Sequence, residues 1–209
     1  MKRLAILAIV TLALAGCSGS PSSSPTTTTT TAAALAPAVS TTAAPSVQSL
    51  MLSITDLPTG WSVDNTPQSA STSCYTNPLN QVSSKSYASV AFAKGGSLPE
   101  LIEELGSYVS GSAAFTTVTN TLNKCKTFTE TSKGQVVNGT MGQMSSPTYG
   151  DQSAAYEATL TIQGVDVNQG FVMIRKGNYI TLIALGDLGS LDAPTLQGFV
   201  NQAVAKIPG

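Results

Sequence analysis

Three segments of the chain repeat apolar residues at the three-to-four-residue spacing of an amphipathic helix. The first begins with Ser97-Leu98-Pro99-Glu100, which has the pattern of a capping box. The second begins near Ser112 and the third at Asp192, a residue type favoured at helix N-caps. We therefore predict three helices. Their apolar positions are Leu101, Ile102, Leu105, Tyr108 and Val109 in the first, Phe115, Val118, Leu122 and Cys125 in the second, and Leu196, Phe199, Val200, Ala203, Val204 and Ile207 in the third.

Between the second and third of these segments the apolar period falls to two, the period of a half-buried strand. Tyr156–Ile162 alternates apolar and polar residues, and Gln163-Gly164 predicts a turn into Val165–Arg175. Gly177-Asn178 predicts a second turn, into a strand over Tyr179–Leu185. Weaker strand patterns occupy Trp61–Val63, Tyr87–Ala93 and Val136–Met144.

Tight turns between neighbouring strands favour antiparallel pairing over a parallel, doubly wound sheet. The sequence therefore predicts an α+β fold, in which an antiparallel meander of about five to six strands packs with three or so helices. Gly170, inside the second of the clear strands, predicts a bulge or kink. We expect a single domain over residues 47–209, long enough to bury one core.

The N-terminus has the parts of an export signal: two basic residues, an apolar run over Leu4–Leu14, and small residues before Cys17. Leu14-Ala15-Gly16-Cys17 resembles the lipobox of bacterial lipoproteins. The resemblance implies cleavage after the signal peptide (residues 1–16) and a diacylglycerol group on the Cys17 thiol. An ordinary signal peptide with a chance cysteine is the alternative reading. A membrane span would need about 20 apolar residues, more than this run provides.

The segment over residues 17–46 is rich in Ser, Thr, Ala and Pro and includes six consecutive threonines, Thr26–Thr31. It contains too few large apolar groups to offset the entropy of ordering it, so we expect a disordered tether. Such a tract also suits O-linked sugars, and a bare and a glycosylated spacer are both open. We expect the protein to be exported and anchored to the outer face of the cell membrane by the lipid on Cys17.

Charge excludes two classes of partner. Removing the signal peptide leaves eight of the ten basic residues against eleven acidic ones, a net charge of about −3, and Arg175 is then the only arginine. A nucleic-acid-binding face needs clustered Lys and Arg, and a polybasic membrane patch needs the same. We therefore expect no nucleic acid as partner, and membrane attachment through the lipid alone. The domain is expected to be monomeric.

Two cysteines remain once Cys17 is lipidated, Cys74 and Cys125. An exported domain meets an oxidising compartment, and two thiols allow one intramolecular pairing, so we expect a disulfide between them. The alternative is two unpaired buried cysteines. A disulfide requires their Cα atoms to lie within about 7 Å.

The sequence offers little support for catalysis. It contains no histidine, which excludes conventional Ser-His-Asp and Cys-His chemistry. Phosphate-binding loops, nucleophile elbows, metal-ligand spacings and cofactor motifs are also missing from it. A pair of carboxylates could serve a glycosidase, and Glu100, Glu103 and Glu104 are the candidates. Their place in the first predicted helix indicates a solvated face, so we expect a protein that is not an enzyme and needs no cofactor or metal.

Three residues are weak candidates for a ligand site. Trp61 is the only tryptophan and follows a Pro/Gly turn, although a lone Trp at a strand start more often covers the core. Arg175, beside the Gly177-Asn178 turn, could receive an anionic group, although charge at a hairpin tip is usually only solvated. Tyr156 begins the clearest strand. We expect a site near Trp61 or on the sheet face between Tyr156 and Leu185.

The lipobox, the Thr/Ala/Pro tether, the Asp56-Leu57-Pro58-Thr59-Gly60-Trp61 start and the paired cysteines resemble actinobacterial cell-envelope lipoproteins. From Gly150-Asp151-Gln152-Ser153-Ala154-Ala155 to the last helix, the chain resembles the extracellular sensor domains of mycobacterial receptor Ser/Thr kinases. Those domains typically have two cysteine pairs, whereas this chain has one pair and no kinase. The resemblance implies an antiparallel sheet packed with helices and a cleft for an unidentified small molecule, glycolipid or envelope ligand. A lipid or glycolipid carrier of the cell envelope is the alternative function.

Overall fold

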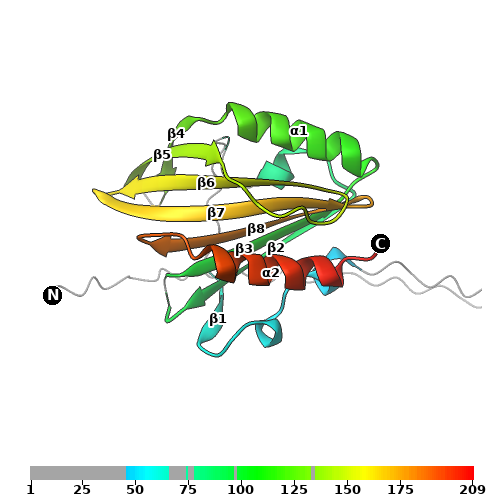
Figure 1. Cartoon of the computed structure of the whole chain (residues 1–209), viewed down its shortest axis with the longest axis horizontal. Helices are drawn as coiled ribbons and strands as arrows, with labels where there is room; N and C mark the ends of the chain where they lie inside the picture. The colour runs from blue at the N-terminus through cyan, green and yellow to red at the C-terminus, as the bar shows by residue number, and fades with distance from the viewer. Residues whose placement is uncertain (1–45, 66–73, 75–77, 97, 133–134) are drawn as a thin grey trace, which may run out of the picture. The chain divides into compact units, whose positions relative to one another are not determined.

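Eight antiparallel strands form one sheet in the part of the chain that the structure describes (Figure 1). The computed structural model describes residues 46–65, 74, 78–96, 98–132 and 135–209. The signal peptide, Cys17 and nearly all of the predicted tether lie outside these residues. The strands are β1 (Trp61–Asp64), β2 (Ser86–Lys94), β3 (Glu100–Ser107), β4 (Thr127–Ser132), β5 (Gln135–Gln143), β6 (Gln152–Ile162), β7 (Val165–Lys176) and β8 (Tyr179–Leu188).

The strand order is β1-β2-β3-β8-β7-β6-β5-β4, so the sheet consists of two meanders that meet where β3 pairs with β8. The antiparallel α+β prediction is confirmed, but the predicted number of about five to six strands is wrong. Each predicted strand is present. The two strands that bring the number to eight are β4, for which no strand was predicted, and β3, where a helix was predicted.

Local turn chemistry explains the best-predicted part of the sheet. Gln163 and Gly164 adopt φ angles of +52° and +80°, and they join β6 directly to β7, with Ile162 paired to Val165. Gly177, with φ of +60°, opens the turn between β7 and β8, where Lys176 pairs with Tyr179. Both predicted hairpins are therefore confirmed.

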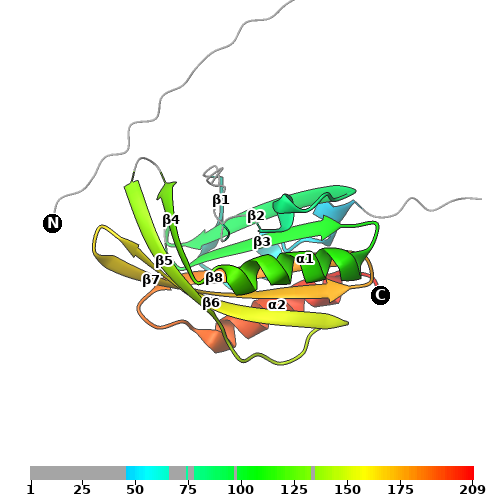
Figure 2. The ribbon, with the colours of Figure 1, turned by 90° about the horizontal axis from the view of Figure 1, so that it is seen from above.

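Two α-helices lie on opposite faces of the sheet, as the view from above shows (Figure 2). The first, α1 (Gly111–Lys124), is capped by Ser110, whose side chain accepts a hydrogen bond from the Ala113 amide. The second, α2 (Ala193–Lys206), is capped in the same way by Asp192. Short 3-10 turns complete the described elements: η1 (Val47–Leu50), η2 (Ile54–Asp56) and η3 (Pro78–Gln81).

The predicted helix at Ser97–Val109 is wrong, because Glu100–Ser107 is the strand β3. This strand pairs with β2 on one side and with β8 on the other, and both of its faces are covered. Leu101 packs in the cluster below the sheet with α2, and Ile102 packs against the cluster below α1. A strand buried on both faces carries no two-residue alternation, so its apolar residues imitate a helical stripe.

The predicted bulge at Gly170 is also wrong. The register runs without interruption from Glu157 through Gly170 to Leu185. Gly170 is instead a place of close packing, because a Cβ atom there would lie 2.3 Å from a methyl carbon of Leu191 and 3.0 Å from one of Leu196. A glycine in a strand interior often marks such an approach.

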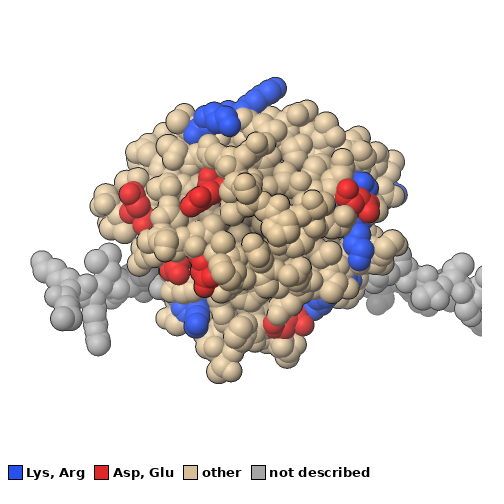
Figure 3. Space-filling view, in the orientation of Figure 1, with Lys and Arg blue, Asp and Glu red and all other residues tan. Residues whose placement is uncertain are grey.

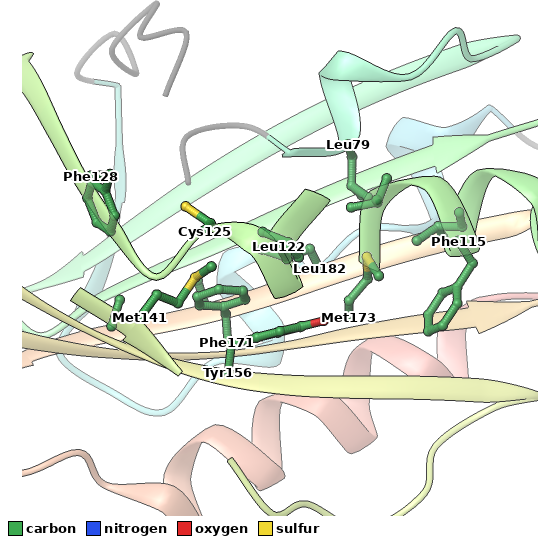
Figure 4. Close-up of a cluster of buried hydrophobic side chains, with 14 of the residues drawn as sticks. Leu79, Phe115, Leu122, Cys125, Phe128, Met141, Tyr156, Phe171, Met173 and Leu182 are labelled. Carbon is green, nitrogen blue, oxygen red and sulfur yellow. The ribbon is translucent and has the colours of Figure 1, made fainter. Parts of the chain in front are cut away.

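The larger apolar cluster lies between the sheet and α1 (Figure 4). Tyr156 and Phe171 stack with ring centroids 5.3 Å apart, and Cys125, which follows the helix, belongs to the same cluster. A second cluster packs α2 against the other face, and a third, smaller one joins η1 to β3. Both helix stripes that the sequence predicted correctly are buried in these clusters, as expected of amphipathic helices.

Candidate functional site

An open groove of about 460 Å³ lies over the outer strands β4, β5 and β6. This volume is within the range of small-molecule sites. The lining residues are Thr127, Phe128, Thr129, Asn138, Gly139, Thr140, Thr159 and Thr161. Five of the eight are threonines, and none carries a charge.

Strand register explains how these residues come together. Thr127 pairs with Thr140, which pairs with Thr159; Thr129 pairs with Asn138, which pairs with Thr161. The six polar side chains therefore form two rows across three strands, about 4.8 Å apart between strands and about 7 Å apart along them. Residues that alternate with them, such as Phe128 and Leu160, are buried in the apolar cluster on the α1 side of the sheet. The rows thus lie on the other face of the sheet.

That face is open at β4–β6 because α2 makes its main contacts with β8 and β7, further along the sheet. Five of the six polar side chains in the rows are exposed, and Thr159 is half-buried. On the opposite face Gly139 leaves room for the Phe128 ring, because a Cβ atom at position 139 would lie 2.1 Å from that ring. The groove is therefore a polar surface built on well-paired backbone.

Hydrogen bonds orient several of these side chains. The Thr129 hydroxyl donates to Asn138 Oδ1 over 3.0 Å. Thr161 donates to Asp166 over 2.7 Å, and Thr159 donates to Asn168 Oδ1 over 2.8 Å. A hydroxyl that donates its proton inside the protein keeps acceptor capacity for a ligand, and Asn138 keeps its amide donors. The lining side chains can therefore accept and donate hydrogen bonds, and the Asp166 carboxylate that Thr161 contacts is a charged group beside them.

Charged residues are scattered on the face of the molecule shown in Figure 3, with broad uncharged surface between them. Within the described residues, two ion pairs are present: Arg175 with Asp151, at 2.9 Å, and Lys206 with Asp56. The described part of the chain contains no cluster of three or more His, Cys, Asp or Glu side chains that could hold a metal ion. No helix in that part is long and apolar enough to cross a membrane.

The expectation that Glu100, Glu103 and Glu104 lie on a solvated helix face is wrong. They belong to β3, where Glu100 is half-buried and Glu103 and Glu104 are 0% and 3% exposed. Consecutive residues of a strand point to opposite faces, so Glu103 and Glu104 do not converge on one point. They do not form the paired carboxylates of a glycosidase. Burial raises the pKa of each carboxyl to about 7.

The three weak ligand candidates from the sequence are not brought together. Trp61 packs edge-to-face on Phe199 of α2, with ring centroids 5.5 Å apart, as a cover for the core. Tyr156 is 1% exposed, and its hydroxyl hydrogen-bonds to Asn123. Arg175 is occupied by Asp151, by Gln152 and by the Gly177 carbonyl. Their part in binding a ligand stays a prediction, and none of them lines the groove.

Sequence reasoning missed most of the groove. Thr159 and Thr161 lie on the predicted sheet face between Tyr156 and Leu185, but the other lining residues were not candidates. A signal was present: Thr127-Phe128-Thr129, Asn138-Gly139-Thr140 and Thr159-Leu160-Thr161 each place two polar residues on the same side of a strand. Only the pairing of the three strands shows that these sides coincide.

Cys74 and Cys125 form a disulfide, with their Cα atoms 5.8 Å apart. The bond lies next to the groove in the chain, since Cys125 ends α1 and β4 begins two residues later. Lys126, between them, accepts a hydrogen bond from the Met141 amide of β5 over 2.9 Å. The disulfide thus fixes the point at which the chain enters the outer strands.

Comparisons with known proteins bear on the fold. No protein-family model matches the chain, and no curated protein matches it by sequence. Among solved structures, the chain is similar to the extracellular domain of PknH from Mycobacterium tuberculosis, with a TM-score of 0.59 and 12% sequence identity. The match covers 76% of this chain and 93% of that domain. The chain therefore shares its fold, an antiparallel sheet packed with helices, with that extracellular domain.

Proposed function

We propose that this protein is an exported lipoprotein whose domain binds a neutral, hydrogen-bonding ligand of the cell envelope in the groove over β4–β6. The observation that carries the proposal is the groove itself, with its two rows of hydroxyl and amide side chains on an uncovered sheet face. The lipobox-like sequence at Cys17 and the fold of an extracellular domain support the location.

The chemistry of the lining favours binding over catalysis at this groove. The lining side chains include no titratable group, and the Asp166 carboxylate that Thr161 contacts has no second acid in the lining to act with it, so the groove lacks the paired groups of acid–base catalysis. The same lining favours a ligand rich in hydroxyl or amide groups. The alternative function is a lipid or glycolipid carrier. The groove would suit the sugar portion of such a ligand better than its acyl chain, because an acyl chain has no polar atoms and would leave the hydroxyl and amide groups of the groove without hydrogen-bond partners.

Replacing Thr140 and Thr159 with valine tests the groove. Valine keeps the shape of threonine and removes the hydroxyl, and a hydrogen bond contributes about 1 kcal/mol, so the double variant should bind roughly tenfold or more weakly. The probes are soluble peptidoglycan fragments and neutral oligosaccharides, and binding is followed by shifts of backbone amide signals in NMR spectra. Thr117→Val, on the exposed side of α1, is the matched control. Shifts that cluster away from β4–β6, or that persist in the double variant, would place the site elsewhere.

Replacing Cys17 with alanine tests the anchor. The variant lacks the thiol that the lipobox resemblance assigns to diacylglycerol, so we expect it to leave the detergent phase in phase-partitioning experiments or to accumulate as uncleaved precursor. Ser18→Ala, one residue later, is the control and should partition like the wild type. Equal partitioning of the wild type and of Cys17→Ala that has been cleaved to the mature size would contradict the lipoprotein assignment.

A further inference from the structure

Two consecutive carboxylates, Glu103 and Glu104, lie buried at the middle of the sheet, one toward each face. Among the described residues neither has a Lys or Arg nitrogen within ion-pair distance. Buried carboxylates are normally paired with a cation or neutralised. Here each carboxylate instead lies within hydrogen-bond distance of a backbone amide in a segment that packs on the sheet and is neither strand nor α-helix.

Glu103 faces the side of α2. Its Oε2 accepts a hydrogen bond of 2.6 Å from the Leu52 amide, and Thr181 of β8 lies 3.4 Å from Oε1. The charged groups on this side are Lys206 of α2 and Asp56 of η2, which pair with each other and act on Glu103 in opposite directions. Leu52 belongs to the segment 47–52, which contains η1 and lies near the start of the described chain.

Glu104 faces the side of α1. Its Oε2 lies 3.4 Å from the Leu79 amide of η3, and Tyr108 donates a hydrogen bond of 3.1 Å to the Leu79 carbonyl. The titratable groups on this side are Tyr87 of β2 and Tyr108; Tyr87 also hydrogen-bonds to Glu104. Burial raises the pKa of Tyr108 to about 12, so this hydroxyl stays protonated at every physiological pH. Glu104 alone changes charge on this side near neutral pH.

We propose that Glu103 and Glu104 form a proton-controlled latch, which holds the segments 47–52 and 78–82 closed on the two faces of β3 in acid and releases them as the pH rises. The protonated carboxyls are neutral, so their burial carries no cost of desolvating a charge. Once ionised, each is stabilised by water, and water reaches it only when the segment that covers it moves away. Opening therefore releases protons, and a rising pH favours it.

The titration range agrees with this direction. The pKa of each carboxyl is about 7 in the closed state, against an ordinary value of 4.5. If an opened segment restores the ordinary value, the open population grows more than tenfold between pH 5.5 and pH 8, since each pKa unit corresponds to a factor of ten. This range includes the neutral pH at which an exported domain can operate. The latch is independent of what the groove binds.

Hydrogen exchange of two amides tests the latch, because the Leu52 and Leu79 amides are the donors to the two carboxylates. After correction for intrinsic exchange rates, we expect the protection of both amides to fall more than tenfold from pH 5.5 to pH 8. Glu103→Gln should abolish the fall at Leu52 and leave it at Leu79, and Glu104→Gln should do the reverse. Glu157→Gln, an exposed carboxylate on β6, is the control and should leave both unchanged.

Carbon NMR titration of the glutamate carboxyls in the wild-type protein provides a second measurement that depends on no variant. Both side chains should titrate near pH 7, and the two amides should lose protection over the same range. Protection that does not change with pH would refute the latch. So would Leu52 and Leu79 amides that are as strongly protected as the central amides of β8 at every pH, because they would then exchange only through global unfolding.

Discussion

Removal of the disulfide by Cys74→Ala with Cys125→Ala is expected to lower the free energy of unfolding by about 4 kcal/mol. The two residues are 51 apart in sequence, and closing a loop of this length removes that much conformational freedom from the unfolded chain in the chain-entropy view. Cys125 is also 3% exposed and packs in the cluster under α1, so its replacement removes a buried sulfur atom as well.

Urea denaturation of the double variant and of the wild type, with and without reductant, measures this loss. The reductant should destabilise the wild type to about the level of the double variant and should leave the variant unchanged. An unaltered midpoint in both comparisons would show that the bond contributes nothing to stability. β4 begins two residues after Cys125 and supplies part of the groove lining. We therefore also expect the double variant to bind the groove ligand more weakly than the wild type under conditions in which the variant is still folded.

The parts of the fold that the sequence predicted well are those that local chemistry decides. The hairpin β6–β7–β8 has turn residues at both connections and clear alternation in β6. Helix α2 begins at a capping Asp192 and buries the predicted stripe. In each case the residues that set the structure are neighbours in sequence, so no knowledge of distant partners was needed.

The strand β3 shows where such reasoning fails. Leu101, Leu105 and Tyr108 have helical spacing, and Ser97 with Glu100 imitates a capping box. The segment forms a strand because β2 and β8 pair with it on its two sides, and these two strands are far from each other in sequence. Tertiary pairing therefore overrode a local helix signal.

The same physical reason applies to the candidate site. The groove depends on three strands in one register, and neither row of polar residues is visible until Thr140 is known to lie between Thr127 and Thr159. Glu103 and Glu104 carried a weak signal, since two acids interrupt an apolar run in Leu101-Ile102-Glu103-Glu104-Leu105. On a helix that pair would be solvated; on a strand covered on both faces it is buried.

The buried carboxylates also set the pH dependence of the whole domain. Their pKa is raised to about 7 in the folded state, so the folded protein binds more protons than the unfolded chain between about pH 4.5 and pH 7. The stability that they contribute is fully present below pH 4.5 and is lost as the pH rises through 7. Asp56, whose pKa is lowered to about 2 by its hydrogen bonds to Lys206 and Ser53, acts in the opposite direction, and only below about pH 4.

We therefore expect the domain to be most stable in mild acid and to lose stability from pH 5 to pH 8. Each carboxylate can account for about 3 kcal/mol at the alkaline end, at about 1.4 kcal/mol per pKa unit. Urea unfolding at each pH, followed by the fluorescence of Trp61, measures the change. Glu103→Gln with Glu104→Gln should remove most of the slope, whereas Glu157→Gln should retain it. A stability that is flat or rises between pH 5 and pH 8 in the wild type would mean that both carboxylates reach water in the folded protein.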